Sequence, residues 1–183
     1  VYDWQYGDVG SRLLENDGTG NFIDVSAAKL PPDSQDDPHR AACASCDLDG
    51  DTFPDLVLAV NTTAGGANRL LLNRPDPNDP DPGERRFEDA TMQSNFPTGT
   101  GFSHDVECRD LTGDGIQDII FARRDGLKNM LFENSGMASF TDVSDELLPN
   151  MAVEDTTQEV ELCDLDGDGK VEILFGNGDI VDW

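Results

Sequence analysis

Residues 164–172, DLDGDGKVE, place acidic side chains at alternate positions of a short glycine-containing stretch. Two close relatives lie upstream, at residues 47–55 (DLDGDTFPD) and 110–118 (DLTGDGIQD). Glycine and aspartate at this density favour turns over helices and strands, so we expect each stretch to form a tight loop. The same kind of acidic loop therefore occurs three times in one chain.

Strand-like segments accompany each acidic loop and repeat in the same order. A β-rich apolar run follows every loop, and two further segments follow the first two loops. These segments are residues 56–60, 68–73 and 86–91 after the first loop, residues 119–122, 129–134 and 139–144 after the second, and residues 173–175 after the third. The repeated unit is a strand, an acidic loop and three more strands, which is the size of a β-propeller blade.

Both ends of the chain carry incomplete units. Residues 11–26 match the last two strands of a unit, joined by an Asp-Gly turn, and the last unit stops after its second strand. We predict an all-β fold of four-stranded antiparallel propeller blades: half a blade, two whole blades and another half, or about three blade equivalents. The predicted parts of the single propeller segment 1–183 are a C-terminal half-blade at 1–32, blades at 39–91 and 102–147, and an N-terminal half-blade at 158–183.

Two further expectations concern this architecture. A β-solenoid is the alternative fold, although its coils are usually shorter than these units. The insertion at 74–86, RPDPNDPDPGERR, is expected to be a loop because its proline and aspartate content disfavours helix and strand.

Composition argues against several classes of partner. The chain has 183 residues, enough for one domain with its own core. Acidic residues number 38 against 12 Lys plus Arg, and the formal charge of −26 opposes binding to nucleic acid or to an anionic membrane surface. No apolar run is long enough to span a bilayer, and the first residues lack the basic start and apolar stretch of a signal peptide. We expect a soluble chain without membrane insertion, whose leader was removed or never included.

Alternating acids in a tight loop indicate a metal site. Counted from the first Asp of each loop, the side chains at positions 1, 3, 5 and 9 converge, and without a cation their carboxylates would repel one another. Calcium suits this set because it accepts oxygen ligands in flexible geometry, including a backbone carbonyl at position 7. The predicted ligands are Asp47, Asp49, Asp51, Phe53 and Asp55; Asp110, Thr112, Asp114, Ile116 and Asp118; and Asp164, Asp166, Asp168, Lys170 and Glu172. About three Ca²⁺ ions are expected, with Phe53, Ile116 and Lys170 acting through their carbonyls.

Differences between the loops predict different affinities. Gly115 and Gly169 occupy position 6, where a sharp turn with positive φ favours glycine, whereas the first loop has Thr52 there and Pro54 at position 8. The second loop has the Thr112 hydroxyl in place of a carboxylate. We therefore expect the third loop to bind calcium most tightly.

Two other interpretations of the acidic loops are less favourable. An EF-hand requires a bidentate Glu at position 12 and flanking helices, but Leu58, Phe121 and Phe175 occupy that position and strands are expected on both sides. The plainer alternative is a set of solvated acidic turns. Three loops in the same place of equivalent repeats favour a metal site over that alternative.

The four cysteines, Cys43, Cys46, Cys108 and Cys163, allow several states. A zinc site would start from Cys43 and Cys46, but no second pair follows at zinc-ribbon spacing, and a redox pair would need a βαβ context. Buried thiols or disulfides are favoured, and their pairing is left open. Asn61 begins a glycosylation sequon, which matters if the protein is a secreted glycoprotein.

Three motifs recur together: D-x-D-G-D-G-x-x-D between two strands, then N-R-L-L-x-N, then F-x-D-V-S. This combination resembles the FG-GAP or VCBS repeats of integrin α-subunit propellers and of secreted proteins such as cartilage acidic protein. The resemblance covers about Ser11 to Val181. It implies calcium-bound propeller blades, with the ions in the loops between the first and second strands at one face, in an extracellular, secreted protein of the cell-adhesion type.

The predicted number of blades indicates that the chain needs further blades to complete a propeller. Three blade equivalents are too few to close a ring, since propellers have about four to eight blades. The chain is either a fragment of a longer propeller, or copies of it pair through their half-blades into a ring or an open, fibril-like filament. Unpaired strand edges at both ends favour partners over an isolated monomer.

Function is expected to be structural. We expect no enzyme activity, because the sequence has neither a nucleophile–histidine–acid signature nor a phosphate-binding glycine loop, and acids bound to calcium cannot also act as general acid and base. The expected role is a calcium-binding structural, adhesive or self-assembling scaffold module. The alternative is a calcium-dependent lectin-like propeller that binds a glycan through Tyr2, Trp4, Tyr6 and Trp183.

Overall fold

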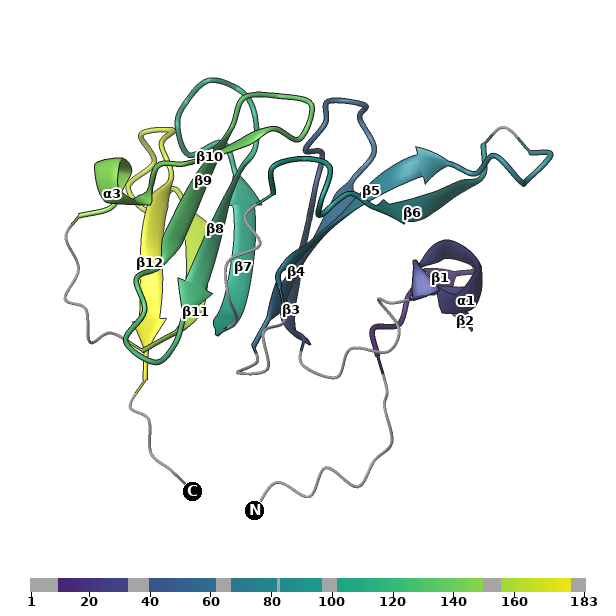
Figure 1. The fold of residues 1–183 in the computed structure, drawn as a ribbon, viewed down its shortest axis with the longest axis horizontal. Coiled ribbons are helices and arrows are strands. Elements are labelled where there is room, and N and C mark those ends of the chain that lie inside the picture. The colour runs from purple at the N-terminus through teal and green to yellow at the C-terminus, as the bar shows by residue number, and fades with distance from the viewer. Residues whose placement is uncertain are drawn as a thin grey trace, which may run out of the picture.

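The strands of the computed structural model are arranged as parts of a β-propeller (Figure 1). The structure describes residues 10–32, 40–61, 67–81, 83–96, 102–149 and 156–178. Two four-stranded antiparallel sheets form the centre, and a two-stranded sheet belongs to each end of the chain. The predicted fold class of half a blade, two blades and another half is therefore confirmed, whereas the residue boundaries of the blades stay predictions.

Each central sheet is a blade in which consecutive strands are neighbours. The first consists of β3 (Arg40–Cys46), β4 (Asp55–Val60), β5 (Arg69–Pro75) and β6 (Arg85–Asp89). The second consists of β7 (Ser103–Arg109), β8 (Asp118–Arg123), β9 (Met130–Asn134) and β10 (Phe140–Asp142). In both, an acidic loop joins the first strand to the second.

The terminal sheets contain two strands each. They are β1 (Leu14–Asn16) with β2 (Phe22–Asp24), and β11 (Thr157–Cys163) with β12 (Glu172–Asn177). Two short helices, α1 (Ser26–Lys29) and α3 (Ser144–Leu147), follow β2 and β10. Within the described part of the chain, these helices fall far short of the length needed to cross a bilayer.

The first strands of successive blades lie side by side. β3 contacts β7, and β7 contacts β11, while the three acidic loops lie at the same end of their sheets (Figure 1). Strand register places Cys46 opposite Asp55, Arg109 opposite Asp118, and Cys163 opposite Glu172. These pairs occupy equivalent places, one at the base of each acidic loop.

Apolar side chains alternate between the two faces of each sheet and fill the spaces between sheets. Val57, Leu70, Ile119 and Phe121 belong to the core between the first and second blades. A second core lies between the second blade and β11–β12, and a third lies between the N-terminal segment and the first blade. Burial of this apolar surface is the main favourable contribution to folding.

Burial of equivalent residues depends on whether another blade lies beside them. Leu48, at position 2 of the first loop, is 1 % exposed beside the second blade, whereas its equivalent Leu165 is 69 % exposed. Val57 on β4 is fully buried, whereas its equivalent Leu174 on β12 is 58 % exposed. The outer face of β11–β12 therefore carries apolar residues at positions that an adjoining blade covers elsewhere in the structure.

Buried asparagines tie each blade to the next. Asn68 accepts a hydrogen bond from the Val60 backbone N–H at 3.0 Å and donates to the Ser103 hydroxyl at 3.0 Å. Asn129 repeats this pattern one blade later, since it donates to the Thr157 hydroxyl at 3.0 Å. The asparagine that opens N-R-L-L-x-N is thus a structural residue that links the second and third strands of its own blade to the first strand of the next.

Two local features differ from the sequence-based expectations. The ends of the insertion 74–86 belong to β5 and β6, because Arg74 pairs with Arg86 and Pro75 with Arg85, so the prediction of a loop throughout was wrong at these residues. Pro75 is tolerated at the end of its strand, where a missing backbone donor costs little. The helices α1 and α3 were not anticipated, because a four-residue helix has no detectable periodicity.

One disulfide connects the two whole blades. Cys46 at the end of β3 is bonded to Cys108 on β7, with their Cα atoms 6.4 Å apart. Cys43 and Cys163 are free thiols. The zinc interpretation of Cys43 and Cys46 is excluded because Cys46 is consumed by the disulfide.

Candidate metal centre

The first aspartate of each acidic loop organises the backbone around itself. Both carboxylate oxygens of Asp47 accept backbone N–H groups, from Gly50 at 2.8 Å and from Thr52 at 2.8 Å. Asp110 and Asp164 accept the equivalent pairs of N–H groups in the second and third loops. Position 1 therefore fixes the turn before any ligand is considered.

Position 6 has a left-handed backbone in all three loops. The φ angle is 89° at Gly115 and 86° at Gly169, as expected for glycine, and it is 74° at Thr52. A β-branched residue is strained in this region. The first loop thus adopts the same turn as the others despite its threonine.

The structure brings carboxylates together in two of the three loops. In the first loop, ligand oxygens of Asp47, Asp49 and Asp55 lie within 4.8 Å of one another. In the third, the equivalent set is Asp164, Asp166 and Glu172, also within 4.8 Å. Each set joins positions 1, 3 and 9 of its loop.

The acids at position 5 lie outside these two sets. Asp51, Asp114 and Asp168 each accept the backbone N–H of position 7 through Oδ1, at 2.9, 2.8 and 2.8 Å. The side chain of Lys170 at position 7 of the third loop pairs with Asp168 at 2.7 Å. The roles of the position 7 carbonyls of Phe53, Ile116 and Lys170 as metal ligands stay predictions.

The acid at position 9 of the first two loops lies at the base of its loop and also accepts backbone hydrogen bonds. Asp55 and Asp118 are fully buried, and each accepts backbone N–H groups from position 2 of its own loop and from an asparagine of the third strand. The pKa of Asp55 is raised to about 6, mainly by burial and also by the neighbouring Asp49 and Asp51, against the lowering effect of the two N–H bonds. A cation beside Asp55 would stabilise its charged form.

The second loop has a different set of oxygens. Its carboxylates Asp110, Asp114 and Asp118 do not form a cluster as close as those of the first and third loops. The Thr112 hydroxyl is buried and has no hydrogen-bond partner among the described residues. A buried hydroxyl without a partner in an acidic loop fits the predicted role of Thr112 as a metal ligand.

Calcium fits these donors better than a soft metal does. The side chains of all three loops offer oxygen atoms, and neither histidine nor cysteine occupies a ligand position. The residues that would hold the ion are positions 1, 3 and 9 in the first and third loops, with position 5 close by. Because coordination numbers of six to eight are usual for calcium, backbone carbonyls and water would have to complete each shell.

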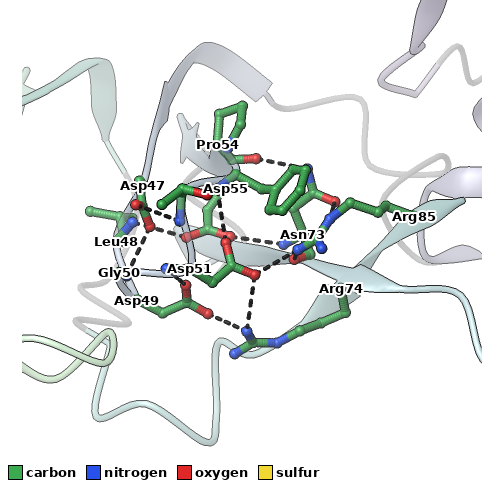
Figure 2. A network of polar contacts seen from close by, with 12 residues as sticks. Asp47, Leu48, Asp49, Gly50, Asp51, Pro54, Asp55, Asn73, Arg74 and Arg85 are labelled. Carbon is green, nitrogen blue, oxygen red and sulfur yellow. Dashed lines mark hydrogen bonds and ion pairs between the residues drawn. The ribbon is translucent and has the colours of Figure 1, made fainter. Parts of the chain in front are cut away.

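Two arginines near the first loop were missed by the sequence analysis. Arg74 on β5 forms an ion pair with Asp49, and Arg85 on β6 donates to Oδ2 of Asp51 at 2.6 Å (Figure 2). Both lie near the ends of the insertion 74–86, which was expected to be a loop. The only signal for them was an unusual density of arginine beside an acidic segment, and that does not say which acid an arginine contacts.

The histidine on β7, His104, does not belong to this centre. His104 on β7 forms a hydrogen bond between Nδ1 and the Gln158 carbonyl at 2.7 Å, which links two neighbouring first strands. The four aromatic residues proposed for glycan stacking, Tyr2, Trp4, Tyr6 and Trp183, lie outside the described residues. Asn61 is described, whereas the rest of its sequon is not.

Comparison with protein families gives an independent result. The FG-GAP-like repeat family matches the chain twice, over residues 47–121 and 110–175. Each match begins at the first aspartate of an acidic loop and ends on the strand after the next loop. No curated protein matches the chain. Since the two matches together cover more than half of the sequence, the chain belongs to the FG-GAP-like repeat family.

Proposed function

We propose that the acidic loops bind calcium, and that the chain is a calcium-stabilised propeller segment with a structural or adhesive role outside the cell. FG-GAP repeats occur in extracellular β-propeller domains of the adhesion type, and this fold is typically non-catalytic. The observation that carries the calcium proposal is the approach of carboxylate oxygens within 4.8 Å in the first and third loops. Like charges this close are costly in the absence of a cation, and a divalent ion reverses the sign of the interaction.

An extracellular location is supported by two properties of the chain. The disulfide between Cys46 and Cys108 requires an oxidising compartment to form and persist. FG-GAP repeats are typical of extracellular proteins, where calcium is present at millimolar concentration and weak sites are occupied. Three bound Ca²⁺ ions would change the formal charge from −26 to about −20, and this smaller negative charge would reduce self-repulsion.

The proposed partner is another blade of the same kind. Leu165 and Leu174 are exposed on β11–β12, while the next blade buries their equivalents Leu48 and Val57. At the other end, an apolar cavity of about 340 Å³, lined by Leu13, Leu30 and Leu58 among others, lies between the N-terminal segment and the first blade. Further inner strands would fill such a space in a complete propeller. We therefore infer that a neighbouring blade, from a longer chain or a second copy, covers the face of β11–β12.

Thermal unfolding tests the calcium proposal. Ions that bind only the native state stabilise it by about 2.7 kcal/mol per site at a concentration of 100 Kd. We expect Tm to rise on replacing EDTA by calcium, and Asp166→Asn to reduce this rise, since the amide keeps the Oδ1 acceptor but loses the charge. Asp145→Asn on α3 is the matched control, because Asp145 pairs with Lys128 away from the loops. Equal transitions in EDTA and calcium would refute the proposal.

Measurement of the molecular mass in solution tests whether the partner is a second copy of the chain. An isolated chain should associate with itself as its concentration rises, because Leu165 and Leu174 are exposed at β11–β12, and Leu165→Asp should suppress that association. Sedimentation of the two proteins over a range of concentrations measures this. Wild-type protein that stays monomeric at all concentrations would exclude a second copy and leave only blades of a longer chain.

A further inference from the structure

Arg74 and Arg85 stand at the base of the β5–β6 hairpin and point into the first acidic loop (Figure 2). They lie on adjacent strands, since Pro75 next to Arg74 is the cross-strand partner of Arg85. The insertion that sets this blade apart from the second one continues from the same base. Two positively charged side chains of the protein are thus positioned beside a loop whose carboxylates are arranged to bind a metal ion.

The guanidinium groups bind carboxylate oxygens at positions 3 and 5 of the first loop, and the acid at position 3, Asp49, belongs to the set within 4.8 Å. Arg74 forms an ion pair with Oδ2 of Asp49 and lies 3.8 Å from Oδ2 of Asp51. Arg85 donates to Oδ2 of Asp51 at 2.6 Å. The other oxygens of these acids are also engaged: Oδ1 of Asp49 accepts the Asp51 N–H at 3.1 Å, and Oδ1 of Asp51 accepts the Phe53 N–H at 2.9 Å. A cation coordinated by both Oδ2 atoms would therefore have to displace the guanidinium groups.

The surroundings hold these arginines in place. Arg85 stacks on the Phe53 ring, with Cζ 3.6 Å from its centroid, and its Nε donates to the Asn73 side chain at 3.1 Å. The side chain of Asp49 is 5 % exposed, so water screens its ion pair with Arg74 poorly. Charge-assisted bonds in such surroundings are stronger than those at an open surface.

Among the described residues, no arginine pairs with the acids of the third loop as Arg74 and Arg85 do with those of the first. Its Asp166, equivalent to Asp49, accepts the Asp168 N–H at 3.1 Å, and no Lys or Arg of the described segments forms an ion pair with it. The cation that is present, Lys170, is exposed and pairs with Asp168. The first and third loops have the same arrangement of carboxylates at positions 1, 3 and 9. They differ in that Arg74 and Arg85 pair with acids of the first loop.

We propose that Arg74 and Arg85 compete with calcium for Asp49 and Asp51, so that calcium in the first loop is weakly bound and coupled to the β5–β6 hairpin. This inference rests on the proposed calcium function. In the ion-free state the arginines neutralise the first loop and keep it folded. When calcium enters, the two guanidinium groups leave the carboxylates, and the base of the hairpin rearranges. The third loop, free of this competition, binds calcium independently.

A site-resolved calcium titration tests this competition. The amide signals of Gly50 and Thr52 report the first loop in ¹H–¹⁵N NMR spectra, and those of Gly167 and Gly169 report the third. We expect the double variant Arg74→Gln/Arg85→Gln to bind calcium in the first loop about tenfold more tightly than wild type, because one buried ion pair and one charge-assisted hydrogen bond no longer have to be broken. The affinity of the third loop should stay unchanged. Arg12→Gln/Arg86→Gln is the control for the loss of two positive charges, since these arginines pair with Asp24 and Asp76.

The outcomes separate the inference from the function on which it rests. If the third loop binds calcium and the first-loop affinity of the double variant is unchanged or lower, the competition is refuted while the proposed function stands. The same holds if the control variant tightens the first loop equally. If neither loop responds to calcium in any variant, the proposed function fails and the competition with it. Should the double variant not fold, Arg74→Gln alone, at a partly exposed side chain, must still tighten the first loop.

Discussion

Asn134 on β9 donates a hydrogen bond through Nδ2 to the Leu48 carbonyl at 2.8 Å, across a sequence separation of 86 residues. The Ala138 backbone N–H donates to the same carbonyl at 2.9 Å. Leu48 is position 2 of the first acidic loop, so the outer hairpin of the second blade holds the loop of the first blade. The asparagine that closes the N-R-L-L-x-N motif therefore connects the candidate metal centre to the packing of neighbouring blades.

Asn134→Ala should destabilise the protein strongly. Asn134 is fully buried, and its amide also donates to the Gln117 carbonyl at 3.1 Å, so truncation removes both hydrogen bonds and leaves the Leu48 carbonyl with the Ala138 N–H as its remaining donor. The expected loss is about 3 kcal/mol in the free energy of unfolding, measured by urea denaturation. The equivalent variant Asn73→Ala is the control, because the Asn73 amide donates at an exposed site to Pro54 and its oxygen accepts from the part-buried Arg85, and it should cost about 1 kcal/mol. Equal losses would contradict this role for Asn134.

Removal of the disulfide should destabilise the link between the whole blades. The bond between Cys46 and Cys108 closes a loop with a sequence separation of 62 residues. In the chain-entropy description, a loop of this length contributes about 4 kcal/mol by restricting the unfolded chain. Cys46→Ala/Cys108→Ala should therefore lower the urea midpoint markedly, whereas Cys163→Ala should leave it near wild type. A double variant as stable as wild type would show that this bond contributes nothing to stability.

Thr52→Gly should stabilise the first loop. Thr52 has φ 74°, where a β-branched side chain is strained by about 1–2 kcal/mol, and its backbone N–H bond to Asp47 does not need the side chain. Part of this gain is offset by the greater freedom of glycine in the unfolded chain, so the net gain is about 0.5–1 kcal/mol. The reverse change Gly115→Thr in the second loop should destabilise the protein. Urea denaturation measures both changes, and a loss of stability on Thr52→Gly would mean that the threonine side chain has a favourable role.

Glu107→Gln should change how stability depends on pH. Burial raises the pKa of Glu107 above its usual value, and the neighbouring Asp105 and Glu161 raise it further. Because the folded-state pKa lies above the unfolded value, the contribution of Glu107 is fully present below the unfolded pKa and is lost as pH rises through the folded pKa. The variant should therefore be more stable than wild type near pH 7 and gain little near pH 4. Urea denaturation at both pH values checks this, with Glu88→Gln at an exposed position of β6 as the control for net charge.

Repetition made much of the fold predictable from the sequence. The residues 56–60, 119–122 and 173–175 follow equivalent acidic loops, and all three segments lie within the second strands of their sheets. A signal that recurs in the same order constrains the assignment more than any single segment does. For the same reason, the side chains at positions 1, 3, 5 and 9 were expected to converge, and the structure brings the carboxylates at positions 1, 3 and 9 within 4.8 Å in the first and third loops.

Contacts that do not repeat were beyond sequence reasoning. The disulfide joins Cys46, opposite Asp55, to Cys108, which lies opposite Ile119 and so one place earlier on its strand. Cys108 points back toward the first blade because successive side chains of a strand alternate between its faces. Four cysteines allow three pairings, and the sequence cannot choose between them without this register.

Arg74 and Arg85 illustrate a second limit of prediction from the sequence. The insertion at 74–86 has a composition that predicts a loop, and the structure extends β5 and β6 into its ends. Pairing with the neighbouring strand outweighed local preference there. Only that extension puts Arg74 and Arg85 beside the acidic loop.

A crystal structure grown in millimolar calcium and measured for anomalous scattering tests calcium binding by the acidic loops most directly. We predict a calcium peak in the third loop, with oxygens of Asp164, Asp166 and Glu172 at about 2.3–2.6 Å. We also predict a weaker peak beside Asp47, Asp49 and Asp55, with the Arg74 and Arg85 guanidinium groups moved away wherever that peak is occupied. Well-ordered loops without any peak in the presence of calcium would show that these loops do not bind the ion.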